Sequence, residues 1–214
     1  MGKDAQRIRK VMSLLKRRYG VGRPPFLHFS TPWQALAATI LSAQAQDPTV
    51  NKATSVLFRK YPSVGDYARM KPEQLYAYTR TIGLYRGKSK NIINSAKIIV
   101  KQFDSKVPKT MDELVGLPGV GRKTANIVLS NAYNINQGIA IDTHCIRVSN
   151  KLGFVDTKDP VKIEKRLMDI APKSDWREVN HLFIDLGRDV CTARKTYCER
   201  CVLNKICPSS TVRR

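Results

Sequence analysis

The sequence predicts an all-α protein. No segment alternates polar and apolar residues over the length of a β-strand, whereas apolar residues recur at three- and four-residue spacing along the 214-residue chain. Signals for the start of a helix also recur. Thr31-Pro32, Asp47-Pro48 and Asp159-Pro160 each place a capping side chain before a proline at the first helical position. The length allows one large or two small helical domains.

These signals define helices in order along the chain. We expect them at 4–19, 32–42, 48–60, 72–79, 87–103, 110–115, 122–133, 142–152, 160–170 and 175–188. Breaks fall at 20–25, 61–62, 83–87, 107–108 and 134–138, which are rich in Gly, Pro or Asn. The first and last breaks are candidates for crossings between domains.

The charge balance indicates a polyanionic partner. Lys and Arg number 38 against 17 Asp and Glu, which gives a formal net charge of +21. Because the basic residues are spread over the whole chain, nucleic acid is the first candidate. No run of eighteen apolar residues occurs, so we expect no membrane span.

Residues Leu117-Pro118-Gly119-Val120-Gly121 read as a tight turn that leads into a helix. Glycine can adopt positive φ, proline fixes its own φ, and uncovered N–H groups before a helix attract anions such as phosphate. Taken alone, Gly-x-Gly is more typical of an ordinary turn between packed helices. Lys123 lies just inside the following helix, and Asp142 follows it by nineteen residues.

Four cysteines near the C-terminus have the spacing of a metal site. Cys191-x6-Cys198-x2-Cys201-x5-Cys207 forms three short, unequal loops, which favour a cubane iron–sulfur cluster over zinc. Disulfides are the least favoured alternative, because the cysteine count is odd and no secretion signal is apparent. Cys145 stands apart, and we expect it to be buried and unliganded.

Several segments together carry a family resemblance. They are Leu41-Ser42-Ala43-Gln44-Ala45-Gln46-Asp47 with residues 50–54, Gly83-Leu84-Tyr85, residues 117–125, Ile141-Asp142-Thr143-His144 with Arg147-Val148, and the spaced cysteines. In these residues the chain resembles the endonuclease III family of DNA glycosylases, in the helix-hairpin-helix superfamily. The resemblance implies the helix-hairpin-helix glycosylase fold with a C-terminal 4Fe-4S cluster loop. It also implies a six-helix domain at 25–135 and a helical cluster domain built from 1–24 and 136–214.

The resemblance implies a base-excision-repair enzyme that removes oxidised pyrimidines from duplex DNA and then nicks the strand as an abasic-site (AP) lyase. Lys123 would attack C1′ of the damaged nucleotide and form a Schiff base, and Asp142 would be the partner carboxylate. Both groups would face a cleft between the two domains. Cys191, Cys198, Cys201 and Cys207 would hold the 4Fe-4S cluster.

The resemblance also implies a set of DNA contacts. Gln44 would fill the gap left by the extruded nucleotide, and Leu84 would wedge into the opposite strand. The hairpin would grip backbone phosphates, with a monovalent cation as a further ligand. The DNA-binding residues expected on this basis are Gln44, Leu84, Leu117, Gly119, Val120, Gly121, Arg122 and His144.

Two other functions are alternatives. A monofunctional mismatch glycosylase for thymine, uracil or adenine would let Asp142 activate water, but such relatives usually lack a residue like Lys123. A non-catalytic iron–sulfur DNA-binding protein would have no need of the Lys123 and Asp142 pair. Gln46 stands where common bacterial members carry threonine, and the Lys-to-Asp interval is one residue longer, so the preferred lesion stays open. We expect a monomer, cytoplasmic and nucleoid-associated if the source is prokaryotic.

Overall fold

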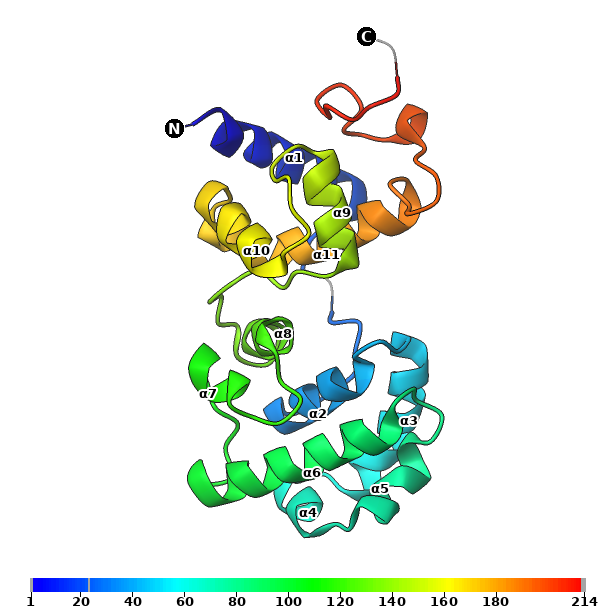
Figure 1. Cartoon of the computed structure of the whole chain (residues 1–214), viewed down its shortest axis with the longest axis vertical. Helices are drawn as coiled ribbons and strands as arrows, with labels where there is room; N and C mark the ends of the chain where they lie inside the picture. Colours follow the sequence, from blue (N-terminus) through cyan, green and yellow to red (C-terminus); the bar gives the residue numbers. More distant parts are fainter. Residues whose placement is uncertain (1, 23, 213–214) are drawn as a thin grey trace. The chain divides into compact units, whose positions relative to one another are not determined.

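The computed structural model describes residues 2–22 and 24–212, and it confirms the all-helical prediction (Figure 1). Within these residues there is no β-strand, and one isolated antiparallel bridge pairs Cys191 with Thr196. No helix in this part of the chain is both long and apolar enough to cross a membrane. Four residues fall outside the described part of the chain. Arg23 belongs to the expected domain crossing at 20–25, and Met1, Arg213 and Arg214 belong to the expected cluster domain.

Contacts within the chain divide it into two compact units. One unit is Pro24–Gln137, and the other combines Met1–Arg23 with Gly138–Arg214. Each unit buries an apolar core of its own. The second unit therefore draws on both ends of the sequence.

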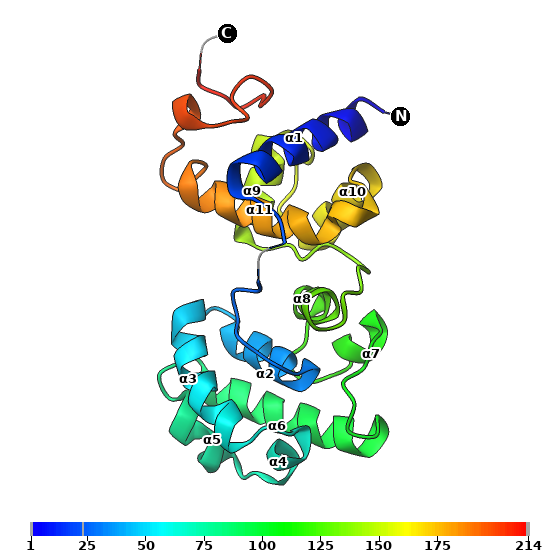
Figure 2. The same cartoon turned by 180° about the vertical axis from the view of Figure 1, so that it is seen from behind.

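The unit Pro24–Gln137 is built around one buried helix. Its helices are α2 (Pro32–Ser42), α3 (Asp47–Lys60), α4 (Val64–Arg69), α5 (Pro72–Thr79), α6 (Tyr85–Gln102), α7 (Met111–Val115) and α8 (Arg122–Tyr133). Every residue of α2 from Trp33 to Leu41 is buried, and α3, α6 and α8 pack against it. Figure 2 shows the long α6 running below α2, where it also contacts α4 and α5. A helix buried all round, such as α2, fixes the positions of the loops at its ends.

Several helix ends differ from the predicted ones by one or two residues; α6, for example, begins at Tyr85, inside the predicted break at 83–87. Two further details also differ. The helix α4 was not expected, because six residues are too few to show a helical period; its signal is the capping box of Ser63 and Asp66. Asp47 is the first residue of α3 and not its N-cap. Gln46 takes the N-cap position, with extended backbone and no side-chain cap. Thr31 and Asp159 do cap α2 and α10, as predicted.

The second unit is built from helices that contact one another in pairs. It holds α1 (Lys3–Tyr19), α9 (Thr143–Lys151), α10 (Pro160–Ile170), α11 (Trp176–Asp189) and the short 3₁₀ helices η1 (Lys173–Asp175) and η2 (Cys198–Arg200). The helix α11 contacts both α1 and α9, and α10 contacts α1 and α9. The buried face of α1 consists of Ile8, Val11, Met12 and Leu15, all at most 1% exposed. The N-terminal helix is thus an integral part of this core.

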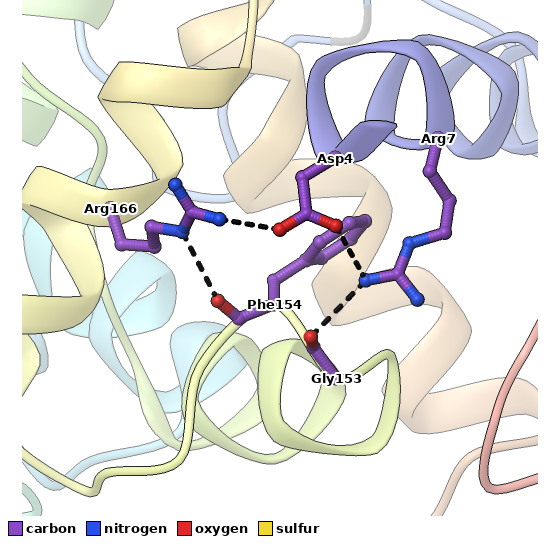
Figure 3. Close-up of polar contacts among 5 residues, drawn as sticks. All are labelled: Asp4, Arg7, Gly153, Phe154 and Arg166. Carbon is purple, nitrogen blue, oxygen red and sulfur yellow. Dashed lines mark hydrogen bonds and ion pairs between the residues drawn. The ribbon is translucent and has the colours of Figure 1, made fainter. Parts of the chain in front are cut away.

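A polar network ties the start of α1 to two later segments (Figure 3). Asp4 forms ion pairs with Arg7 on its own helix and with Arg166 on α10. Arg7 also donates to the carbonyl oxygen of Gly153 at 3.1 Å and stacks over the Phe154 ring. Arg166 donates to the carbonyl oxygen of Phe154 at 3.4 Å. The turn after α9 is therefore held from two helices.

Candidate active site

The hairpin between α7 and α8, residues 116–121, contains the predicted tight turn. Gly119 has φ of +77°, in the left-handed region that favours glycine, as expected. Gly121 does not: its φ is −94° with extended backbone, because it serves as the N-cap of α8. The glycine requirement therefore applies to position 119.

Helix α6 contacts this hairpin through Asn91 and Ser95. A Cβ atom on Gly119 would lie 2.7 Å from Asn91 Nδ2 and 2.9 Å from Asn91 Cβ, so the hairpin backbone rests directly on that side chain. One turn further along, Ser95 Oγ donates to the carbonyl oxygen of Pro118 at 3.0 Å. The position of the turn is thus set by two polar residues on one face of α6.

The hairpin leaves main-chain donors uncovered. The N–H groups of Leu117 and Val120 bond internally to Leu114 and Leu117 carbonyls, whereas those of Gly119 and Gly121 make no hydrogen bond within the described residues. The first turn of α8 adds N–H groups that no side chain caps. Leu117 and Val120 are only 3% and 5% exposed, so only their main chain is available for a ligand. Such an arrangement suits a phosphate oxygen.

Lys123 is the second residue of α8. Its side chain is exposed, as is that of Arg122, while Ala125 turns into the core. Because of the helical repeat, Arg122 and Lys123 face solvent beside the hairpin, whereas Ala125 lies on the buried face of α8. The amine of Lys123 is therefore accessible from solvent beside the hairpin.

Asp142 belongs to the other unit, where it caps α9. Its Oδ1 accepts a hydrogen bond from the Cys145 N–H at 2.8 Å, and the residue is half-buried. Capping thus fixes the orientation of the carboxylate at the start of α9. Cys145 is fully buried, as predicted.

His144 lies on the first turn of α9 in a tight polar contact. Its Nδ1 is 3.0 Å from Arg147 Nη2, and the same Nη2 donates to the Gly187 carbonyl at 3.0 Å. Burial lowers the pKa of His144, Arg147 and Arg188 lower it further, and Asp142 acts in the opposite direction. Since arginine only donates, the Nδ1 atom that bonds to Arg147 is the acceptor.

Gln44 and Leu84 line one hollow on the surface of the unit Pro24–Gln137. Gln44 lies in the loop after α2, and Leu84 directly precedes α6. Both have left-handed backbone, with φ of 54° and 59°, and Leu84 is 70% exposed. The hollow is lined by Ala43, Gln44, Leu84, Tyr85, Arg86, Gly87, Lys88 and Asn91. Non-glycine residues in this conformation carry strain, which is frequent at functional sites.

Lys88 and Asn91 in the lining of this hollow were not predicted from the sequence. Lys88 is only 7% exposed, and its Nζ donates to the carbonyl oxygen of Leu41 at 2.8 Å. Burial lowers its pKa. A sequence signal was present, because Lys88 precedes Ile92 and Ala96 at four-residue spacing on the apolar face of α6. A lysine in such a register breaks the polar and apolar pattern.

The four C-terminal cysteines line one cavity in the second unit. Cys191, Cys198, Cys201 and Cys207 contribute to its wall, together with apolar residues of α9 and α11. Within the described residues, however, no three His, Cys, Asp or Glu side chains converge on a position for a single metal ion. Burial raises the pKa of Cys191, Cys201 and Cys207, whereas hydrogen bonding by Thr211 lowers the pKa of Cys198. Four thiols around one space have the donor chemistry for a cluster of several metal atoms.

Comparison with known proteins agrees with these features. A family model described as "HhH-GPD superfamily base excision DNA repair protein" matches residues 37–173. The chain is 42% identical to endonuclease III of Synechocystis sp., over 98% of this chain and 95% of the relative. It is 45% identical to endonuclease III of Bacillus subtilis, over 83% and 81%.

A solved structure of similar fold extends this result. A trapped endonuclease III–DNA covalent intermediate is 38% identical, covers 98% of both chains and superimposes with a TM-score of 0.89. A thermostable thymine-DNA glycosylase, at 20% identity and a TM-score of 0.85, shares the fold. The chain therefore belongs to the endonuclease III family of the helix-hairpin-helix base excision DNA repair proteins.

Proposed function

We propose that this protein is a DNA glycosylase and AP lyase that removes oxidised pyrimidines from duplex DNA. The observation that carries the proposal is the position of Lys123, an exposed amine on the first turn of α8, directly after a hairpin with uncovered N–H groups. The likeness to an endonuclease III captured as a covalent intermediate with DNA supports it.

Lys123 is the nucleophile in this proposal. Its deprotonated Nζ gives its lone pair to C1′, the C1′–N bond breaks, and the damaged base leaves with the bonding electrons. Opening of the sugar gives a protonated Schiff base. Removal of a C2′ proton then breaks the bond from C3′ to the 3′ phosphate, which nicks the strand. Water hydrolyses the imine and returns the free lysine.

Asp142 is the partner carboxylate. Its cap on α9 fixes one oxygen, and the other can accept the proton of Lys123 or stabilise positive charge on the sugar. Lys123 belongs to the unit Pro24–Gln137, and Asp142 belongs to the other unit. We propose the domains as 25–135 and as 1–24 with 136–214.

The DNA contacts follow from the same arrangement. The N–H groups of Gly119 and Gly121 hold a backbone phosphate, with the main chain of Leu117 and Val120 ordering the turn and a monovalent cation as a further ligand. Arg122 and His144 contact flanking phosphates. Gln44 fills the gap left by the extruded nucleotide. Leu84 wedges into the opposite strand.

Cys191, Cys198, Cys201 and Cys207 hold a 4Fe-4S cluster in this proposal. The fit rests on four thiols around a single cavity. The four thiolates would hold the cluster, and their bonds to iron would fasten the segment 191–207. A Cys198→Ser variant should contain less than about four iron atoms per chain, the number that the intact site holds. Iron and acid-labile sulfide analysis of wild type and variant tests this.

We further propose that the protein acts as a monomer on damaged double-stranded DNA, in the cytoplasm with the nucleoid if the source is prokaryotic. Both proposals can be tested on the purified holoprotein. Sedimentation with and without a lesion duplex measures the number of chains on the DNA.

The activity is tested with duplexes that carry one thymine glycol, one abasic site or one G·T mismatch, with wild type and Lys123→Ala. Strand nicking without alkali by wild type, and its loss in Lys123→Ala, is the expected result. Base release that requires alkali to reveal a nick and that persists in Lys123→Ala would instead favour a monofunctional glycosylase in which Asp142 activates water.

A further inference from the structure

Lys88 is an unusual residue for a basic protein in which most cations face solvent. It is 7% exposed, and no carboxylate lies within ion-pair distance of it among the described residues. A buried ammonium without a counter-charge is costly unless other groups replace its water. The group that does so is the carbonyl oxygen of Leu41, 2.8 Å from Nζ.

That carbonyl belongs to the last turn of α2. Helix C-termini leave carbonyl groups without intrahelical partners and carry partial negative charge, so a cation is favourable there. The loop that begins at Ala43 contains Gln44, whose backbone is left-handed. Lys88 therefore holds the end of α2 from which the Gln44 loop departs.

Lys88 also forms a hydrogen bond to the segment that contains Leu84. Its backbone N–H donates to the carbonyl oxygen of Leu84 at 3.1 Å, which closes the first turn of α6 behind that residue. Leu84 has left-handed backbone and is 70% exposed, so few side-chain contacts fix it. One residue thus makes a side-chain bond to the Gln44 segment and a main-chain bond to the Leu84 segment, and it lines the hollow between them.

We propose that Lys88 is a positioning residue that holds Gln44 and Leu84 in the geometry needed to occupy the gap left by an extruded nucleotide. The inference rests on the proposed glycosylase function. Extrusion of a base is uphill because stacking and pairing are lost, and a plug offsets that loss only when it is preorganised. The bond from Nζ to Leu41 sets the distance between the two loops.

The test compares Lys88→Met with Lys97→Met on the holoprotein. Methionine keeps a linear apolar stem and removes the ammonium, and Lys97 is an exposed lysine on the same helix. Single-turnover excision of a thymine glycol from duplex DNA should fall about ten-fold in Lys88→Met, because the base must be extruded. Cleavage of a preformed abasic site should fall by less than about two-fold, since no base has to leave the stack. Lys97→Met should lower the two reactions by equal factors.

A double-mutant cycle separates positioning from general stability. In a Gln44→Ala/Leu84→Ala background, Lys88→Met should cost less than about two-fold in excision, because the groups it positions are absent. The fluorescence of a 2-aminopurine placed opposite the lesion should change on binding to wild type and change much less with Lys88→Met. If Lys88→Met does not fold, Lys88→Gln, which is neutral and shorter, takes its place.

Equal losses in both reactions, or a full ten-fold cost in the Gln44→Ala/Leu84→Ala background, would overturn the role of Lys88. Wild-type protein that neither excises thymine glycol nor cleaves an abasic site would instead overturn the proposed function. The two failures are therefore distinguishable.

Discussion

Gln44 and Leu84 adopt the same left-handed backbone conformation in the lining of one surface hollow. Their φ angles are 54° and 59°, and they lie at the two places where a chain segment meets a helix end, after α2 and before α6. For residues other than glycine this conformation costs of the order of 1 kcal/mol each. The surrounding structure stabilises both, and Lys88 bonds to both segments.

Leu84→Asn should separate stability from activity. Asparagine tolerates left-handed backbone, and the leucine side chain is exposed, so the free energy of unfolding should stay within about 1 kcal/mol of wild type. Excision of a paired lesion should nevertheless fall about ten-fold if Leu84 is the apolar wedge that we propose, because that wedge is then lost. Urea unfolding and single-turnover kinetics measure the two quantities. A variant with full excision activity would remove Leu84 from the site.

Gly119→Ala and Gly121→Ala form a matched pair on the hairpin. At position 119 alanine meets both a positive φ of +77° and Asn91 within 3 Å, so the variant should lose about 1–3 kcal/mol of stability. At position 121 the backbone is extended and no atom lies within 4 Å of the added Cβ, so alanine should be tolerated. Thermal unfolding checks this. DNA affinity, measured at the same salt concentration, should fall clearly only for Gly119→Ala.

His144 should make stability depend on pH. Its pKa is lowered from the ordinary value of 6.5, chiefly by burial. The unfolded chain therefore binds the proton at a higher pH than the folded chain, and the free energy of unfolding falls as the pH drops below about 6.5. His144→Gln should flatten this dependence, and His28→Gln, at an exposed position, serves as the matched control variant. Urea titrations between about pH 7.5 and pH 5 measure the slope. Identical slopes in all three proteins would contradict the assignment.

The N-terminal helix should be stabilised by its apolar face more than by its ion pairs. Ile8 is fully buried, and Ile8→Ala should cost about 2–5 kcal/mol. The Asp4 ion pairs are partly exposed, with side-chain exposures of 35% for Asp4 and 41% for Arg166. Asp4→Asn should therefore cost less than about 1 kcal/mol, and the loss should shrink with added salt. A larger cost for Asp4→Asn than for Ile8→Ala in urea unfolding would reverse this order.

Much of the fold could be predicted from the sequence, because long helices with clear apolar faces and proline caps leave strong local signals. The ranges 32–42, 72–79, 122–133 and 160–170 agree with the structure to the residue. The short α4 was missed, since its capping box at Ser63 is a weaker signal than a helical period.

The backbone conformations and the burial of residues at the candidate site were harder to predict from the sequence. The left-handed φ of Gln44 and Leu84 and the buried position of Lys88 depend on contacts between α2 and α6, which lie more than forty residues apart in sequence. Gly121 is able to adopt positive φ, but its role as an N-cap requires extended backbone. Local patterns predict elements, whereas contacts between elements determine such conformations.

The central claim, that Lys123 forms a Schiff base with abasic DNA, is tested most directly by borohydride trapping. Wild type incubated with an abasic duplex and sodium borohydride should give a covalent protein–DNA adduct, and peptide mass spectrometry should locate the DNA remnant on Lys123. Lys123→Gln should give no adduct while it still binds the duplex. An adduct on another lysine, or an undiminished adduct with Lys123→Gln, would contradict the account.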